Sequence, residues 1–463
     1  MLVLLLAGIS AIGWIWGLAD PRLAIGVIGA FIGSLAVLAI ARFRPFSFVF
    51  LVGLTHLIFY PLAAFLNLLL DTPAVRPDLW DSANLAMAGG AVGCLSLAFG
   101  SWLSRIIPAR RIEIPDFTPP RMTVLISVAI QVIVASLLLA LGLYYHSSVT
   151  GEYAFHNIYY VNALVIISWA GHAGLFLQVY RYSKTGRTYD ALLASGAILL
   201  TIALFAPSGS RTQAFQFLPL LAFLFLTLEK RILVKYVILG IVVVMGLLLT
   251  VGIGIYRDLS GLGILSGNEG IAPIFNTFRS GMESLDGSEA LVVQRLSDFV
   301  ATGRIIEYTP DAIPYSGFKD VGDWWQMLLP GVFRPDIELA MDGARETVRY
   351  GVSTSTKFGS SPVMIIGDLY GRGGWFALVL GMGMIGVALG TLDRRILFRT
   401  SPFTVIFFAV FGRHIFSLVS SSTLNVFVML TRELVLMLLL TYALTRAVAF
   451  IRSHSLLWGQ ASR

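Results

Sequence analysis

The chain contains almost no cysteine and few charged residues. Its single cysteine, Cys94, lies within an apolar run, which excludes an intramolecular disulfide and a cysteine-based metal site. Charged residues make up 13% of the 463 positions, whereas 57% are hydrophobic. A soluble protein of this composition would aggregate, so the sequence indicates an integral membrane protein. The first apolar run has no basic leader and no clear cleavage site, and we expect it to be a retained span.

About a dozen apolar runs are long enough to cross a bilayer, which takes roughly 20 residues at 1.5 Å rise each. We therefore predict an all-α fold, a polytopic membrane bundle of about 12 transmembrane helices with one large extracytoplasmic loop. Nine spans would lie in 1–255, the loop in 256–361, and three spans with a short tail in 362–463. The predicted spans are 2–19, 23–41, 47–70, 82–104, 122–145, 159–180, 189–206, 212–228, 233–255, 362–391, 401–422 and 424–448.

Basic residues concentrate in alternate connections between these runs, which explains the formal charge of +7 without any nucleic-acid partner. Connections with a positive charge excess face the cytoplasm, so we expect both termini inside and the 256–361 loop outside. The basic set contains Arg42, Arg44, Arg105, Arg110, Arg111, Arg121, Arg181, Lys184, Arg187, Lys230, Arg231, Lys235, Arg394, Arg395, Arg399 and Arg452. The other set is poor in basic residues and contains Asp71, Asp78, Asp81 and Glu152.

Small residues recur four positions apart within several spans, as in Gly29 with Gly33 and Gly386 with Gly390. This spacing predicts close helix packing. The two halves of the chain show no convincing repeat. That weakly disfavours the common transporter folds, which are built from repeated halves.

The 256–361 loop mixes charged, aromatic and glycine residues. Helix-like spacing over 280–300 predicts an amphipathic helix on the membrane or the bundle. Trp324 and Trp325 precede Leu328-Leu329-Pro330. Paired tryptophans near a bilayer usually act as an interfacial anchor, and they can also stack on sugar rings, so both roles stay open. The acidic residues of the loop have no metal-ligand spacing, and we expect neither a metal nor a cofactor.

Several arginines fall at or inside the predicted span ends. Arg211 closes the short turn Pro207-Ser208-Gly209-Ser210 before a helix start, where free backbone amides and a guanidinium fork suit phosphate. Arg413 with His414, and Arg432 with Glu433, would lie about 14 Å and 12 Å below the outer surface. Charges at such depth favour a polar cavity open to the outer side, although a structural ion pair to Glu433 is the alternative.

The segment Gly367-Asp368-Leu369-Tyr370-Gly371-Arg372 brings a carboxylate, a phenol and a guanidinium to the outer part of the tenth span. Arg257, where the ninth span meets the loop, could face the same cavity. Several cations in a half-buried cavity suit a polyanionic headgroup with an apolar tail, such as a lipid-linked diphosphate. Asp368, His414 and Glu433 are the candidate groups for activating an acceptor hydroxyl.

Four motifs resemble those of the oligosaccharide repeat-unit (O-antigen, Wzy-like) polymerase family. They are Ser208-Gly209-Ser210-Arg211; Tyr308-Thr309-Pro310 with Ile313-Pro314-Tyr315; Trp325 through Leu329-Pro330 to Phe333-Arg334-Pro335-Asp336; and Gly367-Asp368-Leu369-Tyr370. The resemblance covers most of the C-terminal half. The chain departs from the family where Gly371-Arg372-Gly373 replaces an expected Asn-Phe-Gly.

This resemblance implies a GT-C-like glycosyltransferase of the bacterial cytoplasmic membrane, and the lack of a metal-ligand cluster in the sequence predicts that it is metal-independent. It would move a growing glycan from an undecaprenyl-diphosphate carrier onto a lipid-linked repeat unit, with a chain-length regulator and a flippase of the same pathway as partners. Arg211, Arg413, Arg432, Arg257 and Arg372 would then bind diphosphate, and Trp324, Trp325 and Tyr370 would bind sugar. The rival interpretations are an O-antigen ligase-type transferase, a lipid-linked glycan transporter or flippase, and a non-catalytic export subunit.

Overall fold

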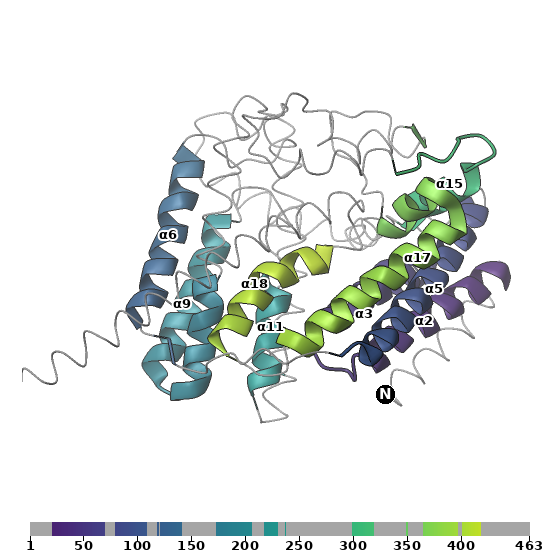
Figure 1. The fold of residues 1–463 in the computed structure, drawn as a ribbon. Helices are drawn as coiled ribbons and strands as arrows, with labels where there is room; N and C mark the ends of the chain where they lie inside the picture. The colour runs from purple at the N-terminus through teal and green to yellow at the C-terminus, as the bar shows by residue number, and fades with distance from the viewer. Residues whose placement is uncertain are drawn as a thin grey trace, which may run out of the picture.

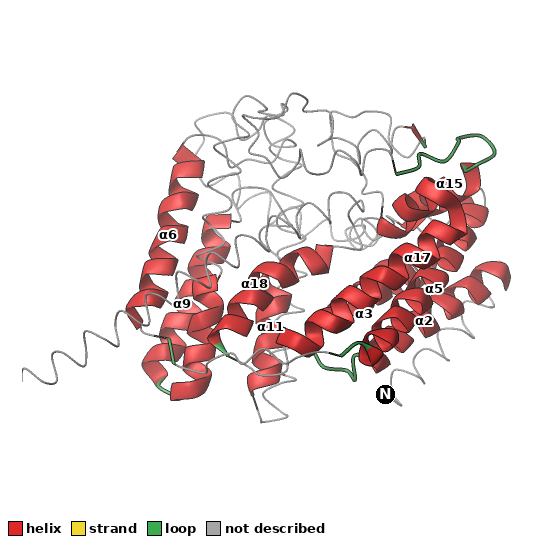
Figure 2. Ribbon diagram, in the orientation of Figure 1, coloured by secondary structure: helices red, strands yellow, loops and turns green. Residues whose placement is uncertain are grey.

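The computed structural model describes residues 21–69, 79–108, 118–119, 121–140, 173–205, 217–229, 237, 299–318, 349–350, 364–396 and 401–417. These residues form helices joined by turns, and no strand occurs among them (Figure 2). Four stretches are long and apolar enough to cross a membrane: Pro21–Ile40, Phe48–Leu69, Trp80–Ile106 and Ile365–Arg395. They confirm as helices the runs predicted at 23–41, 47–70, 82–104 and 362–391.

Shorter helices occupy further predicted runs. They are α6 (Arg121–Ala140), α9 (Thr188–Phe205), α11 (Phe217–Leu228) and α18 (Pro402–Ser417), with another helical stretch at 173–185. The runs at 2–19 and 424–448 lie outside the described residues, as does 233–255 except for Val237. The structure therefore supports a helical membrane protein, and the full set of twelve spans stays a prediction.

The four long stretches pack as one group, seen on the right of Figure 1. Helix α5 (Trp80–Leu103) lies between α2 (Pro21–Ile40) and α17 (Ile365–Ile396), and it makes its most extensive contacts with these two. Helix α3 (Phe48–Leu57) completes the group against α2 and α17. The chain continues from α3 through a π-helical turn, Ile58–Leu62, into α4 (Ala63–Leu69). Pro61 lies inside that turn and lacks the amide hydrogen that a regular α-helix needs.

Glycines let α17 approach α5 closely, as the four-residue spacing predicted. A Cβ on Gly386 would overlap the backbone carbonyl of Leu97, and one on Gly390 would lie 2.9 Å from the Ser101 hydroxyl. A Cβ on Gly33 of α2 would lie 2.9 Å from the Cβ of Cys94 on α5. Helices in a membrane associate largely by van der Waals packing. Because these glycines have no side chain, the backbones can approach closely enough to pack.

One helix of the predicted loop packs directly on this group. The expected amphipathic helix at 280–300 lies almost entirely outside the described residues, and the helix observed is α15 (Phe299–Tyr308). It contacts α5 and the start of α17 (Figure 1). Gly303 fits against the backbone of Ser82, and the Ser82 hydroxyl donates a hydrogen bond to Glu307. Helix α15 is thus fixed to the end of the bundle where α17 begins.

Helix α18 packs mainly on α3 and α11. The contact with the start of α3 and the residues just before it is aromatic. The ring centroids of Phe46 and Phe408 are 4.2 Å apart, and Phe48 contacts Phe407, Phe408 and Phe411. A Cβ on Gly412 would meet Leu220 of α11 and Leu51 of α3. Gly412 of α18 therefore packs beside the first turn of α3, near Leu51.

Candidate functional site

The first turns of α17 contain a helix break. Gly374 has φ +67° and ψ −156°, a conformation essentially restricted to glycine. A Cβ at this position would also lie 2.7 Å from the hydroxyl oxygen of Tyr315. The residues gathered at this break, Tyr315, Asp368, Tyr370, Arg372 and Gly374, are here called the kink cluster. Three of them, Asp368, Tyr370 and Arg372, are candidates taken from the sequence.

A buried ion pair lies one turn before the break. Nε of Arg372 is 3.2 Å from Oδ2 of Asp368, four residues earlier on the same helix. The two side chains are only 5% and 9% exposed. Removing both charges from water is costly, and the four-residue spacing along the helix keeps them paired. In an apolar bundle such a pair is either structural or part of a site.

The segment after α15 is fastened to the break by hydrogen bonds. In an unbroken helix the carbonyls of Gly371 and Arg372 would accept from amides four residues later. Here the amides of Ser316 and Gly317 donate to them, at 2.9 Å and 3.1 Å. Nη1 of Arg372 donates in turn to the carbonyl of Gly317 at 3.2 Å, and its guanidinium carbon is 5.8 Å from the ring centroid of Phe318. Arg372 therefore joins three parts of the site: Asp368, the helix break and the loop.

Tyrosines complete the site. The buried Tyr370 ring lies 5.1 Å from the Trp375 ring and 6.4 Å from the Tyr315 ring, both edge-on. Its hydroxyl donates to the Thr309 carbonyl at 3.5 Å, and the Thr309 hydroxyl is 3.1 Å from the hydroxyl of Tyr350. Tyr315 and Trp375 are about 40% exposed, so each offers an accessible aromatic face beside the buried charges.

Tyr315 and Trp375 are site residues that the sequence pattern did not predict. Trp375 directly follows the glycine pair at the break, which was a usable signal. Tyr315 is 59 residues before Gly374, and only the three-dimensional structure brings its hydroxyl to that glycine.

The other candidate residues either lie away from the kink cluster or fall outside the described residues. His414 is buried on α18, which packs on α3 and α11 rather than on α15. The backbone of Arg413 belongs to the same helix. The remaining candidates, Arg211, Arg257, Trp324, Trp325, Arg432 and Glu433, lie outside the described residues. The shared outer cavity of these arginines thus stays a prediction.

Among the residues that the structure describes, no group of three or more His, Cys, Asp or Glu is arranged to hold a metal ion. The kink cluster holds the carboxylate of Asp368 in a fixed orientation, with the guanidinium of Arg372 on one side and the aromatic rings of Tyr315 and Trp375 nearby. Comparisons of the chain with models of known families, with curated proteins and with solved structures gave no match.

Proposed function

We propose that the protein is a membrane glycosyltransferase that polymerises lipid-linked repeat units. It would move a growing glycan from an undecaprenyl-diphosphate carrier onto the end sugar of a new lipid-linked repeat. The observation that carries this proposal is the buried Asp368–Arg372 pair at a helix break, with Tyr315 and Trp375 exposed beside it. The four sequence motifs that resemble repeat-unit polymerases support it, since two of them, at 308–315 and 367–370, supply residues to the kink cluster.

The proposed step needs one base and one leaving group. The oxygen of an acceptor sugar hydroxyl attacks the anomeric carbon of the donor glycan, while its proton passes to the Asp368 carboxylate. The bond between that carbon and the diphosphate oxygen breaks, and the electron pair leaves with undecaprenyl diphosphate. Arginines stabilise the charge that develops on the diphosphate. Arg211, Arg413, Arg432 and Arg257 are the candidates for this role.

Arg372 has a different role in this proposal from the one its charge first suggests. Its guanidinium already binds Asp368 and the Gly317 carbonyl, and its side chain is nearly buried. We assign it the positioning of Asp368 and of the 316–318 segment. Direct contact with diphosphate would require it to leave both partners.

The position of the cluster favours a transferase over a transporter. Asp368 is the fourth residue of α17, so it lies near one end of this long helix rather than at its middle. A transporter that alternates its access usually binds substrate near the bilayer midplane. A ligase-type transferase would use the same donor with another acceptor, and the products separate the two.

The test is a reconstituted reaction with a lipid-linked repeat unit and gel analysis of product length. Asp368→Asn should lower the rate at least about 100-fold, because a positioned base contributes about that much. Asp81→Asn is the matched control, since it removes an exposed carboxylate near the start of α5. Arg372→Lys should keep part of the activity that Arg372→Gln loses. Full activity in Asp368→Asn would reject the assignment of the base.

A second arm tests the diphosphate residues in cells. Arg211→Ala and Arg413→Ala should leave protein in the membrane while single repeat units accumulate. Normal polymer ladders from both variants would overturn the polymerase proposal. Glycan joined to a different lipid acceptor, with no ladder from the wild type, would favour the ligase.

A further inference from the structure

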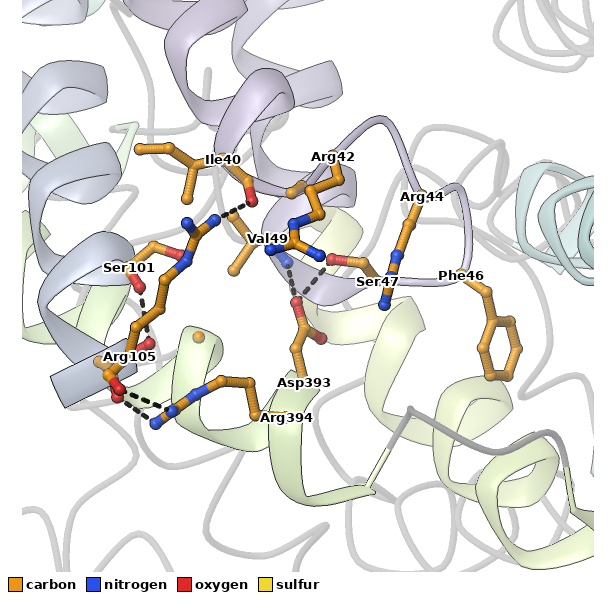
Figure 3. A pocket seen from close by; sticks show the side chains of 13 residues that line it. Ile40, Arg42, Arg44, Phe46, Ser47, Val49, Ser101, Arg105, Asp393 and Arg394 are labelled. Carbon is orange, nitrogen blue, oxygen red and sulfur yellow. Dashed lines mark hydrogen bonds between the residues drawn. The ribbon is translucent and has the colours of Figure 1, made fainter. Parts of the chain in front are cut away.

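Four arginines line one cavity at the opposite end of α17 from the kink cluster. They are Arg42 and Arg44 from the turn between α2 and α3, Arg105 from the 3₁₀ turn (Ser104–Ile106) after α5, and Arg394 from the end of α17 (Figure 3). The cavity has a volume of about 290 Å³, and its buried wall includes Ser47, Ser101 and Ser104. We call it the arginine pocket. The sequence pattern predicted that these three basic connections share one side of the membrane, and here they meet at one end of the bundle.

The one acidic residue of the pocket is already engaged. Asp393 accepts a hydrogen bond from the Ser47 hydroxyl at 2.5 Å and from the amides of Phe48 and Val49 at 2.8 Å and 3.1 Å. The positive end of the α3 dipole thus faces this carboxylate. Counting four arginines and one aspartate gives the lining a formal charge of +4 − 1 = +3. Like charges gathered in a small cavity repel each other unless an anion lies among them.

Two of the arginines are held in place by carbonyl groups. Nη2 of Arg105 donates to the carbonyl of Ile40 at 2.8 Å. The Arg394 guanidinium donates to the carbonyls of Ser104, Arg105 and Ile107. These bonds fix both side chains across the ends of α2 and α5, so little entropy is lost when they bind a ligand.

Arg42 occupies a position that favours glycine. Helix α2 ends with the Phe43 amide bonded to the Leu38 carbonyl and the Arg42 amide bonded to the Ala39 carbonyl, which is a Schellman cap. This cap puts Arg42 in the left-handed region at φ 55°, where a side chain is strained and glycine is usual. Within the described part of the chain its guanidinium makes no hydrogen bond and no ion pair. An exposed guanidinium is thus kept at the pocket at a conformational cost.

We propose that the arginine pocket binds a phosphate group, presented by an anionic phospholipid headgroup or by a free phosphate. Guanidinium forks match phosphate oxygens in pairs. The pocket lies at the ends of four apolar stretches, which is the depth of the headgroups. Exposed apolar side chains flank Arg105 there, Trp102 on α5 and Ile106 in the 3₁₀ turn after it. Basic pockets between transmembrane helices are suited to such headgroups.

The test uses full-length protein in detergent with dioleoylphosphatidylglycerol, and with dioleoylphosphatidylcholine as the uncharged comparison, and native mass spectrometry to measure the lipid retained. Arg42→Gly and Arg44→Gln should each weaken retention of phosphatidylglycerol about tenfold, or 1.4 kcal/mol. Arg395→Gln is the matched control, because it removes the neighbouring exposed charge that does not line the pocket. Arg42→Gly should also keep or raise the melting temperature, which separates lost binding from lost folding.

The second arm distinguishes the two sources of phosphate. Inorganic phosphate and pyrophosphate are added at increasing concentration to the lipid-loaded protein. If the lipid is the ligand, neither anion displaces phosphatidylglycerol at millimolar concentration. The alternative result is that the wild type retains no lipid and that the free anions raise its melting temperature but not that of Arg42→Gly. That result would assign the pocket to a soluble phosphate. The proposal is overturned if Arg395→Gln loses as much phosphatidylglycerol as Arg42→Gly and Arg44→Gln do. It is also overturned if the two lipids are retained equally and free phosphate has no effect on the protein.

Discussion

Asp393 at the end of α17 caps α3 from outside that helix, through the hydroxyl of Ser47 at 2.5 Å. Ser47 is itself the N-cap of α3, and its hydroxyl oxygen accepts from the Phe50 amide at 3.2 Å. Two amides of the first turn, Phe48 and Val49, donate to the same carboxylate. Residues 346 positions apart thus satisfy one helix end together, because the first amides of a helix have no partner within it.

Removing this cap should destabilise the bundle. Asp393→Ala leaves two amides of α3 without their acceptor, and we expect a loss of about 3 kcal/mol, since hydrogen bonds to charged groups are the stronger ones. Ser47→Ala should cost about 1 kcal/mol as an ordinary N-cap change. Thermal unfolding of the purified protein followed by tryptophan fluorescence measures both. The double variant should lose less than the sum of the two, by about 1 kcal/mol, because the residues are coupled. Strict additivity would contradict the shared cap.

The helix break should not accept a side chain. Gly374→Ala forces a Cβ onto a backbone conformation reserved for glycine and against the Tyr315 hydroxyl. We expect a loss of about 1 to 3 kcal/mol in the free energy of unfolding. Gly196→Ala on α9 is the control, because a Cβ there meets nothing within 4 Å and alanine favours a helix. Equal melting temperatures for Gly374→Ala and the wild type would mean that the break is not fixed as described.

The sequence predicted what depends on local spacing. The segment 367–372 placed Asp368 and Arg372 close together as site candidates, although the sequence assigned Arg372 to diphosphate binding and did not predict the ion pair that the structure shows. The interval between Gly386 and Gly390 predicted close helix packing, and the structure shows that packing against α5. Long apolar runs predicted about twelve spans, and within the described part of the chain four of them are helices long and apolar enough to cross a membrane.

The contacts that assemble the sites could not be predicted in this way. Tyr315 reaches Gly374, and the amides of Ser316 and Gly317 reach α17, only because α15 docks on α5. For the arginine pocket, the sequence predicted only that three basic connections lie on the same side of the membrane. Its assembly depends on the packing of α2 and α17 on α5, which the spacing of residues within each helix does not predict.

The close approach of α17 to α5 should depend on single glycines. Gly386→Val would drive its side chain into the Leu97 carbonyl, and we expect at least about 2 kcal/mol of destabilisation from overpacking. Gly383→Ala, one turn earlier on the same helix, is the control, since a Cβ there would lie 3.8 Å from the Ser96 carbonyl oxygen. The yield of monodisperse protein and its melting temperature report the difference. Similar values for the two variants would refute the close packing of these helices.

Among the described acidic residues away from the two sites, Asp190 at the start of α9 should be highly sensitive to substitution. Its buried carboxylate lies 3.1 Å from Nε of Arg181 and 3.4 Å from Nε of Arg121, and it accepts from the Thr185 hydroxyl at 2.7 Å. Asp190→Ala would leave Arg181 buried without this partner. Breaking a buried pair from one side costs about 3 to 5 kcal/mol, and we expect a loss of that size in thermal unfolding.

The two arginines around Asp190 should differ in weight because they differ in exposure. The Arg121 side chain is 40% exposed, whereas that of Arg181 is 11% exposed and also donates to the Pro119 carbonyl. Arg121→Gln should therefore cost about 1 kcal/mol or less, as exposed pairs do, and high salt should reduce that difference. Arg181→Gln should cost several times more and respond little to salt. A larger loss from Arg121→Gln than from Arg181→Gln would show that burial does not set the strength of this ion pair.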